Sequence, residues 1–221
     1  MKQLNCTRNG CQDVFHAFLV ENAEYEGALE MPCMKLETAT PNALIPFSKA
    51  IGSNESDQWI HFYEDDSKFE RLWKDPRKYL PLFKRFNGVI SPDFSVYRDM
   101  PLVMQQWNTY RGRAIGHWLQ RQGVHVIPNI RFGDERSLDF CCAGVPKGGT
   151  IAVGSHGCIR KNEDREYFKQ GLRHAVKTLV PRTIVVYGTT PADIFAQYRK
   201  QGIEVIGIEG NFYIGRKAVS A

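Results

Sequence analysis

From residue 58 onward, short apolar runs alternate with stretches of helical periodicity, and this alternation limits the possible folds more than any other feature. Apolar runs of roughly four to eight residues between helical patterns are typical of strands buried in a parallel sheet. The predicted strands are Trp59–Tyr63, Gly88–Phe94, Val124–Ile130, Thr150–Gly154, Thr183–Tyr187 and Ile203–Ile208. Right-handed crossovers between such strands place helices against the sheet.

Helices are predicted between these strands. The clearest is Met100–Gln122, whose apolar side chains recur every three and four residues and which ends before Gly123. Glu163–Leu179 follows the same pattern, and Thr190 with Pro191 begins another helix. We therefore expect an α/β fold, a three-layer α/β/α sandwich with a mostly parallel central sheet. The alternative is an incomplete β/α barrel, because a complete barrel typically needs about 250 residues.

The chain is expected to divide near residue 57. Residues 1–56 contain short apolar patches broken by prolines, and predict an irregular N-terminal wrap or lid that adds one strand around Ala43–Phe47. Residues 57–221 predict a single compact α/β catalytic domain. No apolar run approaches the roughly 18 residues of a membrane helix, and Met1–Cys6 lacks a secretory apolar region, so we expect a cytoplasmic protein without a membrane partner.

The net charge of +5 is unevenly distributed along the chain. Residues 1–159 carry 18 basic and 18 acidic side chains, whereas residues 160–221 carry 11 basic and 6 acidic ones. A locally basic face attracts phosphate groups, and phosphate contacts make nucleic-acid binding salt-dependent. The same excess could equally be a solvated helix face.

The six cysteines contain no C-x-x-C pair and no zinc-ribbon spacing. Cys141 and Cys142 are adjacent, which suits a strand, and Cys6, Cys11 and His16 form at most a loose metal cluster. Ordinary thiols in a reducing compartment are the default. We therefore expect no metal and no cofactor, and we interpret His117, His125 and His174 as structural.

Three polar loops follow three of the predicted strands, and they contain the candidate catalytic residues. Asp93 follows the apolar run Gly88–Ile90, Asn129 follows Val124–Ile127, and His156 follows Thr150–Val153, between Ser155 and Gly157. The carboxyl ends of parallel strands meet at one edge of a sheet, where ligands bind. Asp93 can position water or stabilise a cation, Asn129 can recognise a base edge, and His156 can donate to an anion. The structural alternatives are a helix cap, a turn and an ordinary buried histidine.

Neighbouring residues are expected to bind substrate or DNA. Tyr97 can stack on a base, Arg98 can hold a phosphate, and Arg131 belongs either to the site or to an ion pair with Asp134. The predicted substrate contacts are Phe94, Tyr97, Arg98, Arg131, Phe132 and Ser155, and the predicted DNA-backbone contacts are Lys147, Arg160 and Lys161. The segment Gly144–Gly149 lacks the order of a phosphate loop, which disfavours nucleoside triphosphates.

The order of these motifs resembles a bacterial and phage-associated domain family of unknown function, over roughly residues 40–210. Some members of such a family are implied to act in antiphage defence as DNA glycosylases that remove a modified cytosine. The layout is also similar to that of the uracil-DNA glycosylases, which have a four-stranded parallel sheet. The resemblance assigns Asp93 to water positioning, Asn129 to base reading and His156 to the departing base. The usual Gly-Gln-Asp-Pro-Tyr motif is absent, and Gly157 stands where proline is common.

The leading hypothesis is therefore a DNA glycosylase that hydrolyses the N-glycosidic bond of a base in double-stranded DNA and leaves an abasic site. As this bond breaks, the sugar gains oxocarbenium character and the base gains negative charge. A carboxylate can stabilise the sugar, and a hydrogen-bond donor can stabilise the base. The base must first leave the stack. Two alternatives remain: a hydrolase or transferase acting on free nucleosides or nucleotides, and a non-catalytic module that binds nucleotide or DNA.

Overall fold

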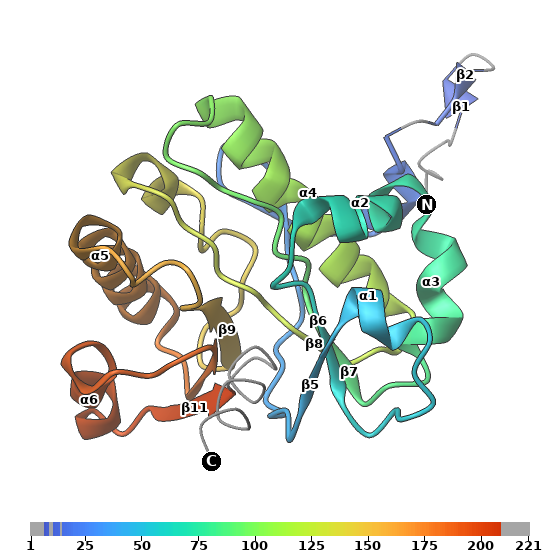
Figure 1. Cartoon of the computed structure of the whole chain (residues 1–221). Coiled ribbons are helices and arrows are strands. Elements are labelled where there is room, and N and C mark those ends of the chain that lie inside the picture. Colours follow the sequence, from blue (N-terminus) through green and yellow to red (C-terminus); the bar gives the residue numbers. More distant parts are fainter. Residues whose placement is uncertain (1–6, 9–10, 14, 209–221) are drawn as a thin grey trace.

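A computed structural model describes residues 7–8, 11–13 and 15–208 of the chain. Its centre is a parallel β-sheet flanked by helices (Figure 1). One part contains β5 (Leu44–Pro46), β6 (Trp59–His61), β7 (Gly88–Ile90) and β8 (Val126–Ile127), in that order. The other contains β9 (Thr150–Gly154), β10 (Thr183–Tyr187) and β11 (Glu204–Ile208).

The two parts of the sheet join at the end of β8. A parallel bridge pairs Asn129 with Ala152 of β9, and the Ile130 N–H donates to the Ala152 carbonyl at 2.8 Å. The strands therefore lie side by side in chain order from β5 to β11. The predicted α/β class is confirmed: a parallel central sheet is flanked by helices, which is consistent with the predicted α/β sandwich. The strand order departs from the four-stranded sheet that the glycosylase resemblance implies.

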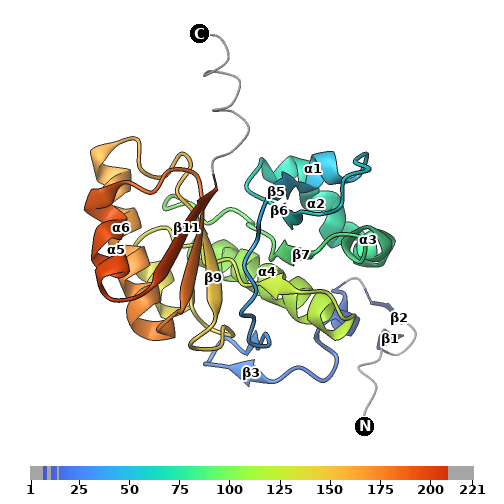
Figure 2. The ribbon, with the colours of Figure 1, turned by 90° about the horizontal axis from the view of Figure 1, so that it is seen from below.

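The helices lie on two flanks of the sheet. The first flank holds α1 (Phe47–Ala50), α2 (Asp66–Lys74), α3 (Pro76–Phe83) and α4 (Leu102–Arg121), and the second holds α5 (Asn162–Leu179) and α6 (Ala192–Lys200). Figure 2 shows α5 and α6 beside β9 and β11, with α4 extending toward α3. Asp75 separates α2 from α3 and caps both helices. Pro76 occupies the first turn of α3, where its missing N–H and fixed φ are tolerated.

Alternating side chains of each strand face opposite sides of the sheet. Ile60, Val89 and Val126 pack with residues of α1–α4 in one apolar cluster, whereas Ile151 and Ile184 pack with α5 and α6 in a second. The strand residues directly adjacent in sequence to these point to the other side of the sheet and form a third cluster, which contains no side chain from a helix: Trp59, Ile90, Ile127, Ala152 and Val185. The sheet therefore has a helix-covered face and an opposite face on which strand side chains meet each other.

The N-terminal segment contributes to the main sheet and its core. The strand predicted around Ala43–Phe47 is present as β5, and Leu19 and Met34 are buried in the first apolar cluster. Short elements precede it: the hairpins β1 (Thr7–Arg8) with β2 (Cys11–Gln12) and β3 (Tyr25–Glu26) with β4 (Met31–Pro32), and the 3-10 helix η1 (Ala17–Val20). Residues 1–56 and the sheet thus share one apolar core. The division of the chain at residue 57 stays a prediction.

The segment containing Cys141 and Cys142 is not the expected strand. It forms a series of turns after the 3-10 helix η2 (Glu135–Asp139), because its backbone N–H groups bond to carbonyls three or four residues earlier. No helix among the described residues is long and apolar enough to cross a membrane.

Candidate functional site

The loops that follow β7, β8 and β9 supply the candidate site, as the sequence predicts. These three strands are parallel neighbours, so their carboxyl ends lie at the same edge of the sheet. The Asn129 backbone N–H donates to Ser91 Oγ at 2.8 Å, which fixes the second loop against the first. This is the edge at which open parallel sheets bind their ligands.

Asp93 and Asn129 form a buried hydrogen-bonded pair. Asn129 Nδ2 donates to Asp93 Oδ1 at 2.7 Å, and its Oδ1 accepts from the Tyr63 hydroxyl at 2.8 Å. Asp93 is 8% exposed and Asn129 only 3%. The amide of Asn129 therefore fixes the orientation of the Asp93 carboxyl, and Tyr63 in turn fixes the amide. The sequence instead predicted a base edge as the partner of this amide.

Arg131 provides the positive charge next to Asp93. Its Nη1 lies 3.4 Å from Asp93 Oδ2 and 3.8 Å from Cys158 Sγ. Burial raises the pKa of Asp93 to about 6, although Arg131 and the Asn129 hydrogen bond both lower it. The nearby Asp93 carboxylate raises the pKa of the guanidinium, which stays charged. The alternative ion pair with Asp134 does not form, because Asp134 pairs with Arg136 at 2.8 Å.

A pocket of about 710 Å³ opens beside Arg131. Its walls come from the loops after β7, β8 and β9 and from the first turns of α5. The sequence-predicted residues that line it are Tyr97, Arg98, Arg131, Phe132 and His156. Phe132 is held there by α5, where a Cβ on Gly171 would come within 2.5 Å of the Phe132 ring atoms.

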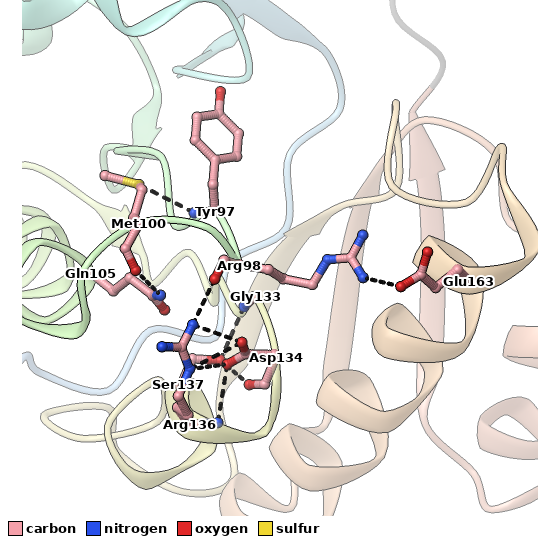
Figure 3. Close-up of polar contacts among 9 residues, drawn as sticks. All are labelled: Tyr97, Arg98, Met100, Gln105, Gly133, Asp134, Arg136, Ser137 and Glu163. Carbon is pink, nitrogen blue, oxygen red and sulfur yellow. Dashed lines mark hydrogen bonds and ion pairs between the residues drawn. The ribbon is translucent and has the colours of Figure 1, made fainter.

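The pocket rim carries a network of ion pairs (Figure 3). Arg98 reaches across to α5, with Nη1 at 2.8 Å from Glu163 and Nη2 at 2.6 Å from Asp164. Its backbone carbonyl accepts from Arg136, which ties the loop after β7 to the loop after β8. The Tyr97 ring points away from the Arg98–Glu163 bridge (Figure 3) and is 54% exposed. Arg98 is thus already paired with two carboxylates rather than open to a phosphate.

His156 lines the same pocket from the end of β9. Its backbone N–H donates to the Tyr187 carbonyl at 3.3 Å, and its ring meets the Tyr187 ring edge-on at 6.3 Å. Gly188 makes this possible: it has a φ of 117°, and a Cβ there would lie 3.0 Å from the His156 nitrogen. The histidine is thus positioned by the adjacent strand β10.

A layer of aromatic residues beneath the site was not predicted. Tyr63 stacks on Tyr187 with ring centroids 4.9 Å apart, and His61 lies 4.4 Å from Tyr187. Burial lowers the pKa of His61 to about 3, so its imidazole is neutral. The signal was the two-residue spacing of Trp59, His61 and Tyr63, which puts all three on one face of a strand.

Two predicted substrate contacts lie elsewhere. Phe94 is 2% exposed and packs in the core against Phe69, with the Arg111 guanidinium 3.8 Å from its ring centre. Ser155 is 1% exposed, and its Oγ donates to the Thr189 carbonyl at 2.8 Å. Both side chains stabilise the fold around the site and do not reach the pocket.

The three predicted DNA-backbone contacts separate into two groups. Arg160 and Lys161 are exposed and directly precede α5, whose first turns form the pocket wall. Lys147 precedes β9, and the neighbouring Gly148 N–H donates to the carbonyl of Leu179 at the far end of α5. Lys147 therefore lies at the amino end of β9, at the edge of the sheet opposite the pocket, and its contact with DNA stays a prediction.

Candidate metal ligands lie outside the pocket. Cys141, Cys142 and a ring nitrogen of His174 have ligand atoms within 4.8 Å of one another, and none of the three lines the pocket. For the looser cluster of Cys6, Cys11 and His16, Cys6 and the Cys11 side chain lie outside the described residues. The buried carboxyl of Asp93 lies beside an amide and a guanidinium, which suits acid–base or electrostatic roles.

Comparison with known proteins places the chain near phage proteins. A domain family of unknown function, DUF4417, matches residues 23–208. The Gene 1 proteins of the mycobacterial phages D29 and L5 are each 36% identical over 129 residues, which is 58% of this chain. The match covers 48% of the D29 protein and 56% of the L5 protein, so it spans about half the length of these relatives. No solved structure matches.

Proposed function

The chain belongs to the DUF4417 family, and we propose that it hydrolyses the N-glycosidic bond of a base in DNA and leaves an abasic site. The proposed substrate is a modified cytosine that has left the base stack. Because both relatives described above come from phages, we propose that this DNA is met during phage infection, as the expected role in antiphage defence requires.

The observation that carries the proposal is the buried carboxyl of Asp93. Burial raises its pKa to about 6, so at neutral pH it is ionised yet still able to accept a proton. Asn129 and Arg131 hold both of its oxygens. Asp93 does not itself line the pocket but contacts Arg131, which does. A fixed carboxylate at this position can stabilise a developing oxocarbenium ion and orient the water that attacks it.

The departing base requires a donor on the opposite side. Arg131 and His156 both line the pocket, and both can donate to a base that gains negative charge as the bond breaks. Water adds its oxygen to C1′ of the sugar, and its proton passes to Asp93. The released base takes its proton from His156 or from solvent.

The proposal differs from the sequence prediction in the residue that contacts the base. Asn129 is buried and already engaged by Asp93 and Tyr63, so we assign it as a positioning residue. Phe132 and Tyr97 line the pocket and offer aromatic surfaces to a flipped base. A pocket of about 710 Å³ is within the size range of small-ligand sites.

A free nucleoside is the second candidate substrate, and the charges at the rim favour it. Asp99, Glu163 and Asp164 line the pocket together with Arg98. Carboxylates repel the phosphates of a polymer but can accept hydrogen bonds from sugar hydroxyls. The same Asp93 chemistry would then act on the small molecule with little dependence on salt.

The first experiment incubates the purified chain with DNA containing normal, uracil-substituted or modified cytosines. Mass spectrometry identifies released bases, and an abasic-site assay on the same samples counts the lesions. We expect one base type to be released with equal numbers of abasic sites, and expect Asp93→Asn to abolish release while DNA binding persists. Release from nucleosides alone would favour the second candidate. Retained ligand without product from either substrate would favour the non-catalytic binding module.

A further inference from the structure

We propose that Cys141, Cys142 and His174 bind a thiophilic divalent metal ion, zinc, at a site separate from the pocket. The two sulfurs lie 3.7 Å apart. Two thiolates bound to tetrahedral zinc at about 2.3 Å lie about 3.8 Å from each other. The sulfur separation in the structure is therefore already the one that zinc requires.

The third ligand comes from a different element. A ring nitrogen of His174, on α5, lies within 4.8 Å of both sulfurs, so an ion placed between them can reach all three. The Thr178 hydroxyl lies 3.4 Å from Nε2 of His174 and can orient the ring. His174 is only half-buried, which leaves solvent access for water as a fourth ligand.

Hydrogen bonds and close packing hold the turn that carries the cysteines. Arg113 donates to the carbonyls of Cys141 and Ala143, at 2.7 and 2.9 Å. Gly144 has a φ of 74°, and its position is tight enough that a Cβ would lie 2.4 Å from the Pro32 carbonyl oxygen. The ligands are thus held in place before the metal arrives, which lowers the ordering that binding would otherwise require.

The local charges also accommodate a divalent ion. Arg113 brings one positive charge to the turn, and the Glu26 carboxylate, which accepts from the Gly144 N–H at 2.7 Å, brings one negative charge. Zinc binding releases the two thiol protons, so the two positive charges of the ion replace the two positive charges of the protons. The net charge of this region therefore stays the same when the metal binds. The donor set of two thiolates and an imidazole favours zinc over magnesium or calcium.

The site would stabilise the candidate pocket indirectly. Arg113 also donates to the Asn129 carbonyl at 2.9 Å, so one buried guanidinium connects the cysteine turn to the residue that orients Asp93. A metal that fixes the turn would fix this connection.

Metal titration of the reduced, chelator-stripped full chain tests the proposal. With Co²⁺ as the probe, we expect thiolate-to-cobalt charge-transfer absorption and tetrahedral visible bands that saturate at one ion per chain. Zn²⁺ should displace the cobalt, and X-ray absorption of the zinc form should show two sulfur ligands at about 2.3 Å. The absence of charge-transfer absorption in the wild-type chain would overturn the proposal.

Variants identify the ligands. Cys142→Ser and His174→Ala should each weaken cobalt binding by at least about tenfold, and His174→Ala changes a half-buried surface position that should not prevent folding. The matched controls are Cys33→Ser and His125→Ala, which lie outside the cluster and should bind as the wild type does. The double variant Cys6→Ser, Cys11→Ser should also retain binding. If the Cys6→Ser, Cys11→Ser variant lost cobalt binding while His174→Ala retained it, the assignment would be overturned.

Discussion

Asp93 has a buried carboxyl whose environment opposes its ionisation. Its carboxyl oxygens contact the Asn129 amide, through a hydrogen bond, and the Arg131 guanidinium at 3.4 Å. These contacts compensate only in part for the loss of water, and the pKa rises from 3.8 to about 6. A carboxylate that is costly to ionise is typical of a functional position, because a residue selected only for stability would be better replaced by a neutral one.

This raised pKa predicts how stability depends on pH. The folded state binds the Asp93 proton more tightly than the unfolded state, so its contribution is most favourable below about pH 4 and is lost as pH rises through about 6. The shift corresponds to about 3 kcal/mol. We expect the free energy of unfolding of the wild type, relative to Asp93→Asn, to fall by about that amount between pH 3 and pH 7. Urea denaturation at several pH values measures it, and parallel pH curves for the two proteins would contradict it.

The bond from Tyr63 to Asn129 should be a coupled interaction. Tyr63→Phe leaves Asn129 Oδ1 buried without its 2.8 Å donor, which should destabilise the chain by about 1–3 kcal/mol. In a chain that already carries Asn129→Ala, the same substitution should cost much less, because no acceptor remains. A double-mutant cycle of unfolding free energies measures the coupling. Additive effects would show that the bond contributes little.

Among the elements, helix α5 contributes to the shape of the pocket wall, because its Gly171 leaves room for the Phe132 ring. Gly171 lies inside helix α5, where alanine is normally more favourable than glycine by about 1 kcal/mol. Here a Cβ would lie 2.1 Å from the nearest atom of the Phe132 ring. The close approach of helix and ring explains why this position carries no side chain.

Gly171→Ala should therefore destabilise the chain by about 1–3 kcal/mol and displace Phe132 from the pocket. The matched control is Gly52→Ala, where no atom lies within 4 Å of the added Cβ. Combining Gly171→Ala with Phe132→Ala should give less destabilisation than the sum of the single changes, because the clash disappears. Thermal and urea unfolding of the four variants measure this, and equal effects at Gly171 and Gly52 would contradict it.

For the whole molecule, the two edges of the sheet define which basic residues can serve the pocket. Arg160 and Lys161 lie at the carboxyl edge beside the first turns of α5, while Lys147 lies at the opposite edge. If DNA binds across the pocket, each lysine or arginine that touches a phosphate contributes to the dependence of binding on salt.

The double variant Arg160→Ala, Lys161→Ala should bind DNA more weakly, and the slope of log binding constant against log salt should decrease by about 2. Lys147→Ala is the control and should leave both quantities unchanged. Fluorescence anisotropy over a range of salt concentrations measures the slopes. An equal effect of Lys147→Ala would show that DNA does not bind at the carboxyl edge.

Much of the element order could be predicted because local patterns dictate it. Apolar runs such as Thr150–Gly154 and Thr183–Tyr187 coincide with β9 and β10, and the three-and-four spacing of Met100–Gln122 gave α4 within two residues. The predicted loops after β7, β8 and β9 also lie at one edge, since parallel neighbours require it. The turn at Cys141 was missed, because two adjacent small apolar residues fit a strand equally well.

The sequence by itself determined that this chain is an α/β protein with polar residues after its strands, because alternation and periodicity are properties of neighbouring residues. Only the tertiary structure decided which of those residues meet. Asp93 joined Asn129, Arg131 and, through Asn129, Tyr63, whereas Phe94 turned into the core and Lys147 lay at the far edge. These outcomes depend on which strands lie side by side and which way each loop turns, and both depend on contacts between residues far apart in the chain.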